Sequence, residues 1–271
     1  MILARRLVPD LVTQMLMVSI AMGLLVSVGV SRSEACTLSP EHGGLSFPVE
    51  RVDPVWTCTL DTIIQGATTE TKVGPIRTAL SEPLYRYLLD HPSFTAALIR
   101  RLHLGLYQVD MRGPGTFWAD DGEGTKGLGQ LVYEDSTSRI YLLEGTHESR
   151  FLPHVTGKAV VFLRMDAVRD VQGDEAMAST MVAYTRLDNR VLSGLVSLLH
   201  PLVSRIVTSR LQKGVETVDR LGKTMKHDPQ RVLSVAEQAP ALPDQHVAFL
   251  KQRLGSRSGS ESVSPDGRAI P

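Results

Sequence analysis

The stretch Val191–Met225, which reads VLSGLVSLLHPLVSRIVTSRLQKGVETVDRLGKTM, decides the fold of this chain. Apolar residues recur in it at intervals of three and four, which places them along one face of an α-helix. They are Val191, Leu195, Leu198, Leu199, Leu202, Ile206, Val215, Val218, Leu221 and Met225. His200-Pro201 either kinks this helix or divides it, and Asp228-Pro229 ends it. A helix with so wide an apolar stripe must bury it against a large partner.

The partner is predicted by the segment ahead of the helix. Apolar and polar residues alternate there in six runs, the period of a β-strand, and turn residues separate most of them. The runs are Leu106–Arg112, Thr116–Ala119, Gly127–Asp135, Ser138–Glu148, Lys158–Arg169 and Ala176–Asp188. Connections this short predict antiparallel pairing, because a parallel crossover needs a dozen or more residues. We expect one face of Lys158–Arg169 in the core and the other partly in water.

The residues before these strands divide into two parts. Residues 36–74 are rich in Thr, Ser, Gly and Pro, which predicts a mostly irregular segment. Residues 75–104 have apolar positions at helical spacing, with Pro75 in the first turn. Pro83 kinks or divides this block, and His91-Pro92-Ser93 begins a second helix.

The C-terminal part is predicted to add little. We expect a short helical extension over residues 231–254, with a helix at Gln245–Leu254. The tail, residues 255–271, has almost no apolar content and is predicted to be disordered.

Residues 1–35 have the pattern of a secretory signal peptide. Arg5 and Arg6 precede the uncharged apolar run Met15–Val30, and Ser33-Glu34-Ala35 supplies small residues before a cut at Cys36. The chain is therefore predicted to be periplasmic or secreted, with cleavage after Ala35. An uncleaved anchor is the alternative, although the run is shorter than the roughly 20 residues that span a bilayer. A lipidated Cys36 is a further alternative, and membrane association is expected only through these two routes.

The chain has two cysteines, Cys36 and Cys58. In an oxidising compartment a disulfide between them is the leading interpretation, and two free thiols are the alternative. No histidine or carboxylate pair accompanies them at ligand spacing, so we predict no metal site and no cofactor. The 29 basic and 29 acidic residues balance, which disfavours nucleic acid as a partner.

Catalytic motifs are absent from the sequence. It has no Gly-x-Ser-x-Gly, no His-Glu-x-x-His and no complete phosphate-binding loop, and Gly122–Gly127 is predicted to be a hairpin turn. His147-Glu148 and His154 attract attention as general bases. Neighbouring residues of a strand point to opposite faces, so His147 and Glu148 should not pair. We expect these histidines in surface loops and assign no catalytic residue.

The order of helix, antiparallel sheet and long C-terminal helix resembles the START-like superfamily, also called SRPBCC, of helix-grip proteins. The resemblance covers about residues 75–230 and includes Leu152–Val160, Tyr184–Asn189 and His227-Asp228-Pro229. It implies an α+β domain whose curved sheet wraps the long amphipathic helix, with an apolar cavity between them for a lipid, sterol or polyketide-like ligand. The strand that usually opens this fold has no clear pattern in the sequence.

If the resemblance holds, the cavity is lined by apolar residues of the strands and the helix. Each of these residues has packing in a filled core as its alternative role. The candidates are Trp118, Tyr141, Leu143, Leu163, Met165, Met181, Ala183, Leu195 and Leu199.

Three functions remain open at this point. The leading one is an exported, non-enzymatic binding protein for a hydrophobic small molecule or lipid. The others are a cyclase- or hydrolase-type enzyme on the same scaffold and a cell-envelope interaction protein with a filled core. An apolar cavity favours the first, and a histidine or carboxylate of perturbed pKa within it favours the enzyme.

Overall fold

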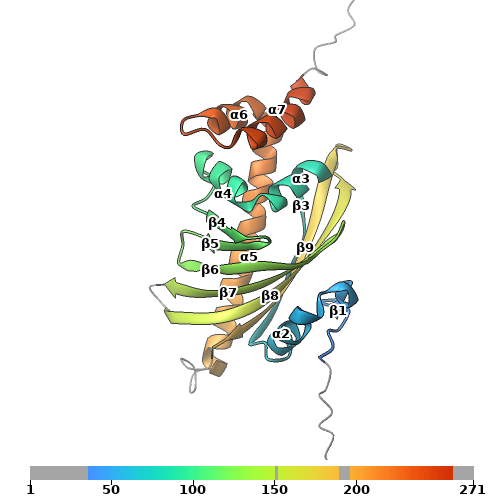
Figure 1. Ribbon diagram of the computed structural model, residues 1–271, viewed down its shortest axis with the longest axis vertical. Coiled ribbons are helices and arrows are strands. Elements are labelled where there is room, and N and C mark those ends of the chain that lie inside the picture. Colours follow the sequence, from blue (N-terminus) through green and yellow to red (C-terminus); the bar gives the residue numbers. More distant parts are fainter. Residues whose placement is uncertain (1–35, 150–151, 189–195, 259–271) are drawn as a thin grey trace, which may run out of the picture. The chain divides into compact units, whose positions relative to one another are not determined.

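Seven antiparallel strands form the main sheet of the protein, which a computed structural model describes over residues 36–149, 152–188 and 196–258 (Figure 1). Their order across the sheet is β3-β9-β8-β7-β6-β5-β4. The strands are β3 (Thr69–Thr78), β4 (Gln108–Gly113), β5 (Thr116–Asp120), β6 (Thr125–Glu134), β7 (Ser138–Ser149), β8 (Leu152–Arg169) and β9 (Glu175–Leu187). With a long C-terminal helix beside this sheet, the predicted α+β class is confirmed.

The six predicted strands correspond to β4–β9, with the largest shift at β8, which begins at Leu152 and not at Lys158. Each strand from β4 to β9 pairs with the next along the chain. This meander follows from the short turns between the runs.

The helical prediction at Pro75 is wrong, because residues 69–78 form β3. This strand is at the edge of the sheet and pairs with β9, and the register shifts between Val73 and Ile76, on either side of Pro75. A proline lacks the N–H that a central strand needs, and it is tolerated at an edge or a bulge. The predicted helix pair starts after β3, as α3 (Glu82–Asp90) and α4 (Pro92–Arg101).

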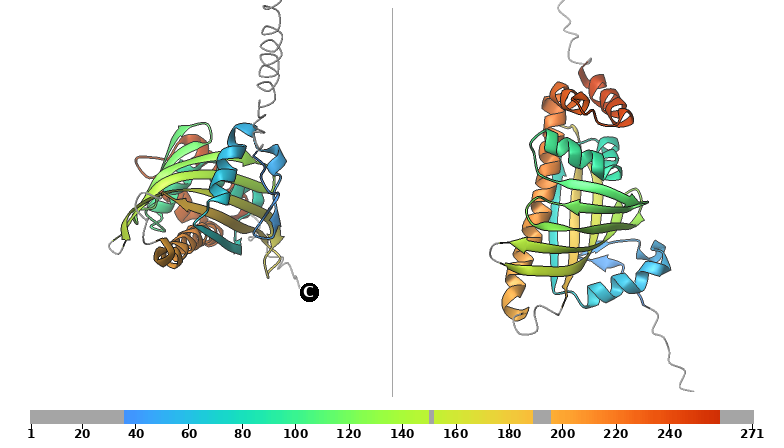
Figure 2. Two further views of the ribbon diagram at one scale, coloured as in Figure 1. Left: turned by 90° about the horizontal axis from the view of Figure 1, so that it is seen from below. Right: turned by 60° about the vertical axis from the view of Figure 1, so that its left-hand side comes forward.

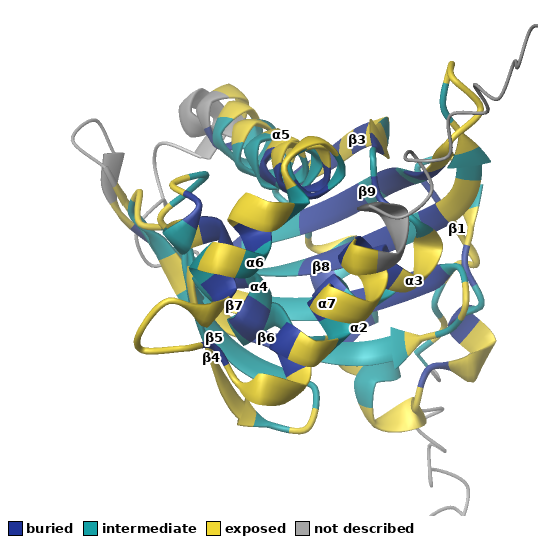
Figure 3. Cartoon of the chain, turned by 90° about the horizontal axis from the view of Figure 1, so that it is seen from above, coloured by how far each residue is buried: buried dark blue, intermediate teal, exposed yellow. Residues whose placement is uncertain are grey.

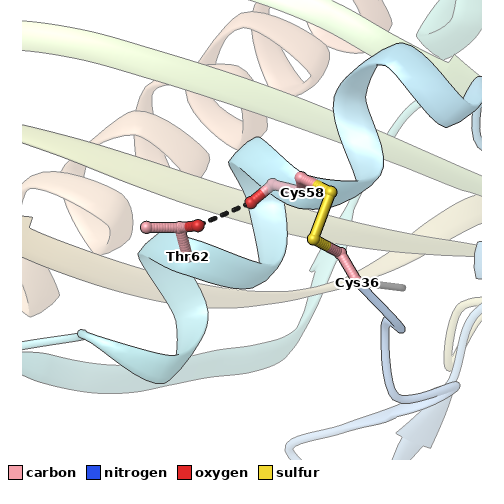
Figure 4. Close-up of a disulfide and its surroundings, with 3 residues drawn as sticks. All are labelled: Cys36, Cys58 and Thr62. Carbon is pink, nitrogen blue, oxygen red and sulfur yellow. Dashed lines mark hydrogen bonds between the residues drawn. A yellow bond between two sulfur atoms is a disulfide. The ribbon is translucent and has the colours of Figure 1, made fainter. Parts of the chain in front are cut away.

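The segment predicted to be irregular is ordered for much of its length. It contains β1 (Glu41–His42), β2 (Leu45–Ser46), η1 (Val49–Arg51) and α2 (Pro54–Gln65). Asp53 caps α2 by accepting a hydrogen bond from the backbone N of Val55 at 2.9 Å. A disulfide joins Cys36 to Cys58 of α2, and Thr62 donates to the Cys58 carbonyl at 2.7 Å (Figure 4).

This N-terminal segment covers one face of the sheet. Val160 and Phe162 of β8, on the face expected to be partly in water, are 0% exposed. They pack with Phe47 and with Leu60 and Ile63 of α2. The prediction of a partly wet face was therefore wrong here, because it assumed that nothing ordered precedes the sheet.

The long helix is α5 (Val196–His227), and it lies along the other face of the sheet (Figure 2). Pro201 lies inside it, so the helix is continuous from residue 196. The part of the prediction before residue 196 falls outside the described residues. Leu221 and Met225 of its apolar stripe are buried in one cluster with residues of α3 and α4.

Two further helices follow α5 where one short helix was predicted, namely α6 (Pro229–Glu237) and α7 (Asp244–Ser258) (Figure 3). Asp228 caps α6 by accepting a hydrogen bond from the backbone N of Arg231. Val232, Leu250 and Leu254 are buried in the cluster that includes α3 and α4. Residues 259–271 of the predicted tail lie outside the described residues.

Candidate functional site

The sheet face that carries α5 is filled in one part and hollow in another. Leu163, Met165 and Met177 pack with α3, α4, α6 and α7. Farther along the same strands, a cavity of about 400 Å³ separates the sheet from α5, and most of its wall is apolar. Small-molecule sites in proteins range from about 300 to 1,000 Å³ and are mostly apolar. The cavity is therefore large enough for a small ligand.

Strand alternation decides which side chains form the apolar wall. Along the parts of β4 to β9 that border the cavity every second side chain faces it, and α5 contributes residues one turn apart. The apolar residues from the strands are Val109, Phe117, Ala119, Leu143, Val155, Ala159, Val161, Ala183 and Leu187, and those from α5 are Val203, Ile206, Val207 and Leu211.

A row of glycines explains why the sheet leaves space at this point. Gly127, Gly145 and Gly157 are direct neighbours across β6, β7 and β8. A Cβ added to Gly145 would lie 2.6 Å from the carbonyl oxygen of Lys126, and one added to Gly157 would lie 2.7 Å from that of Arg186. The strands approach so closely that only glycine fits, and the missing side chains add to the volume of the cavity.

One end of the cavity is polar. Thr125 of β6 and His147 of β7 are direct cross-strand neighbours, and Oγ1 of Thr125 lies 2.9 Å from Nδ1 of His147. Burial lowers the pKa of His147, the positive charge of Arg210 lowers it further, and Asp121 opposes both. The imidazole is therefore neutral at pH 7, with one nitrogen as donor and one as acceptor.

Ion pairs connect α5 to the β5–β6 hairpin beside this polar end. Arg210 and Lys213 both pair with Glu123, and Nε of Arg210 lies 3.5 Å from Oδ2 of Asp121. The hydrogen bond from Lys213 is the main cause that lowers the pKa of Glu123. Asp121 also accepts backbone hydrogen bonds from Glu123 at 2.7 Å and Thr125 at 2.9 Å, which fix the hairpin. Gly122–Gly127 belongs to this hairpin, as predicted.

The cavity candidates from the sequence lie in different places. Leu143 and Ala183 line the cavity. Tyr141, Leu163, Met165 and Met181 belong to the packed cluster beside it. Trp118 points to the opposite face of the sheet, because Phe117 and Ala119 on either side of it face the cavity. Leu195 and the side chain of Leu199 lie outside the described residues.

The surface-loop prediction for His147 is wrong, because this residue lies in β7 and lines the cavity. His147 and Glu148 do not pair, as the alternation predicted: the exposed carboxylate of Glu148 lies 2.6 Å from Nδ1 of His154 on β8. His147 was named from the sequence but not as a cavity residue, and Thr125 and Arg210 were not proposed for the site. The signal for His147 was its place in the predicted strand Ser138–Glu148, where it shares a face with the cavity candidates Tyr141 and Leu143. Thr125 lay in the predicted hairpin turn, which gave no such signal.

Two absences apply to the described part of the chain. There, His, Cys, Asp and Glu side chains form no group of three or more that could hold a metal ion. Within the same ranges, no helix has both the length and the apolar character of a membrane span. The disulfide is compatible with an exported protein.

The comparisons with known proteins are sparse. No protein-family model matches the chain, and no curated protein matches it. Among solved structures, it is similar to a conserved protein from Geobacillus kaustophilus, with 8% identity and a TM-score of 0.40. That match covers 57% of this chain and 94% of the other.

Proposed function

We propose that the protein is an exported binding protein for a small apolar molecule or lipid, held between the sheet and α5. The observation that carries this proposal is the cavity of about 400 Å³ with a mostly apolar wall. Apolar surface that faces a cavity gains free energy when a ligand removes it from water. A filled core, which an interaction protein would have, does not account for this space.

The order of the elements also supports the START-like resemblance. The strand β3 precedes α3 and α4, the six-strand meander follows, and α5 comes after it. A strand at this position is usual in that family, although the sequence pattern did not predict it. Export is supported by the disulfide and by the pattern of residues 1–35, which we propose to be a cleaved signal peptide.

One observation favours an enzyme as the second candidate. His147 lies in the cavity with a lowered pKa and has the Thr125 hydroxyl 2.9 Å away, so a general base and a hydroxyl are in contact. Incubation with a series of p-nitrophenyl esters tests this function. Turnover that is lost in His147→Ala and kept in His154→Ala would favour the enzyme, and equal background rates would exclude ester hydrolysis.

Native mass spectrometry of the mature protein, purified from its own host, tests the binding function. We expect a co-purifying apolar molecule near one equivalent, and lipid extraction of the same sample identifies its class. A bare polypeptide that takes up no member of a fatty-acid, fatty-alcohol and sterol panel would contradict the proposal.

A further inference from the structure

We infer that the cavity selects ligands whose polar group is a neutral hydroxyl or carbonyl, held at Thr125 and His147, and that it discriminates against carboxylates. This inference rests on the proposed binding function and names the ligand class for the same site.

The charged residues that line the cavity balance one another. Two cations of α5 and two anions of the β5–β6 hairpin lie at its polar end: Arg210 and Lys213 against Asp121 and Glu123. Asp120, Lys126, Glu144 and Lys158 also border the cavity, but they alternate with its inward residues, so their side chains point to the opposite face of the sheet. Both cations on α5 are engaged by Glu123, and Nε of Arg210 also lies 3.5 Å from Oδ2 of Asp121. A carboxylate entering this space would find the cations Arg210 and Lys213 already paired. Moving an anion from water into such a site is costly.

The polar end can serve a neutral group in either of its hydrogen-bonding arrangements. When Thr125 donates to Nδ1 of His147, Nε2 carries the proton and donates to a ligand oxygen. When Nδ1 donates to Thr125, Nε2 is an acceptor and can receive a ligand hydroxyl. A hydroxyl satisfies both arrangements, a carbonyl satisfies the first, and the apolar wall accommodates the rest of the molecule.

A matched set of ten-carbon ligands tests the inference. Decanol, decanoate and decane compete with the neutral fluorescent probe N-phenyl-1-naphthylamine at pH 7.5. We expect decanol to bind at least about tenfold more tightly than decanoate. In His147→Leu we expect the affinity for decanol to fall about fivefold, the ratio that corresponds to one neutral hydrogen bond of about 1 kcal/mol. The affinity of the same variant for decane should not fall.

His154→Leu is the control, because His154 is an exposed histidine of β8 that does not line the cavity. Its decanol affinity should equal that of the wild type. If His147→Leu does not fold, His147→Phe replaces it and keeps a ring at this position. Decanoate binding as tightly as decanol, or decanol binding unchanged in the folded His147 variant, overturns the inference and leaves the binding function standing. No binding of the probe or of any ligand overturns both.

Discussion

Filling part of the cavity should weaken binding without unfolding the protein, and Ala159→Phe is the substitution that tests this. Ala159 is a half-buried residue of β8 on the cavity wall, between Leu143 and Thr185 of the adjacent strands. A cavity that holds benzene measures about 150 Å³, so the added ring would take more than a third of the about 400 Å³ available.

The expected loss follows from the six added carbons. At about 0.8 kcal/mol per buried methylene, displacing that much ligand costs up to about 5 kcal/mol. A ligand that shifts recovers part of this, so we expect the Kd to rise at least about tenfold, which is 1.4 kcal/mol. Burying the ring itself stabilises the folded protein by about 2 kcal/mol, and the packing strain that the ring causes costs a similar amount. Tm should therefore change by only a few degrees.

The control is Ala167→Phe, the same substitution on an exposed position of the same strand. Competition with N-phenyl-1-naphthylamine gives the Kd of each variant, and circular dichroism gives its Tm. If Ala159→Phe is folded and its Kd stays within about twofold of both wild type and Ala167→Phe, the ligand does not occupy this cavity.

Three further outcomes concern stability. On α5, Gly214→Ala should raise Tm by about 2–4 °C through a helix-propensity gain of about 1 kcal/mol, because the added methyl group meets nothing within 4 Å beyond the adjacent backbone of its own helix. Gly222→Ala should give no such gain, because its methyl group would lie 2.8 Å from Cγ of Leu80. Equal gains at both sites would show that α5 does not pack on Leu80. Replacing Cys36 and Cys58 by serine should cost about 3 kcal/mol in urea unfolding, and an unchanged midpoint would mean that the disulfide does not form. Burial lowers the pKa of His42, His147 and His246 below the 6.5 of a free imidazole. Below about that pH the unfolded state therefore binds more protons, so Tm should fall between pH 7.5 and 5.5, well above the range in which carboxylates titrate. A flat profile would contradict the burial of these histidines.

The strands from β4 to β9 could be predicted because alternation and turn residues agree there, but β3 and α2 could not. The buried face of β3 begins with Thr69 and Thr71 and reaches an apolar residue only at Val73, so its period of two is weak. Helix α2 is rich in threonine and isoleucine, β-branched residues that disfavour helices, and its formation depends on the Asp53 cap and on packing against the sheet. Both elements are specified by tertiary contacts that no local pattern records.

The contact at the polar end of the cavity could not be predicted from the sequence, because it depends on a one-residue register shift between β6 and β7. The turn between β6 and β7 pairs Glu134 with Arg139, and without interruption this register would place Thr125 opposite Glu148. A register shift between Leu131 and Tyr133 moves the remaining pairs by one residue, so that Thr125 meets His147. Since successive side chains alternate between faces, this one-residue shift also sets which residues of β6 and β7 share the cavity face.

The same shift determines the floor of the cavity. It pairs Gly127 with Gly145, which in turn pairs with Gly157, and without it Gly127 would face a residue with a side chain. The register shift therefore sets two features at once: the close approach of the strands at these glycines and the contact between Thr125 and His147. The hollow and its polar group arise together from the register shift, which explains why the family resemblance implied an apolar cavity while the residues that would select its ligand emerged only from the register.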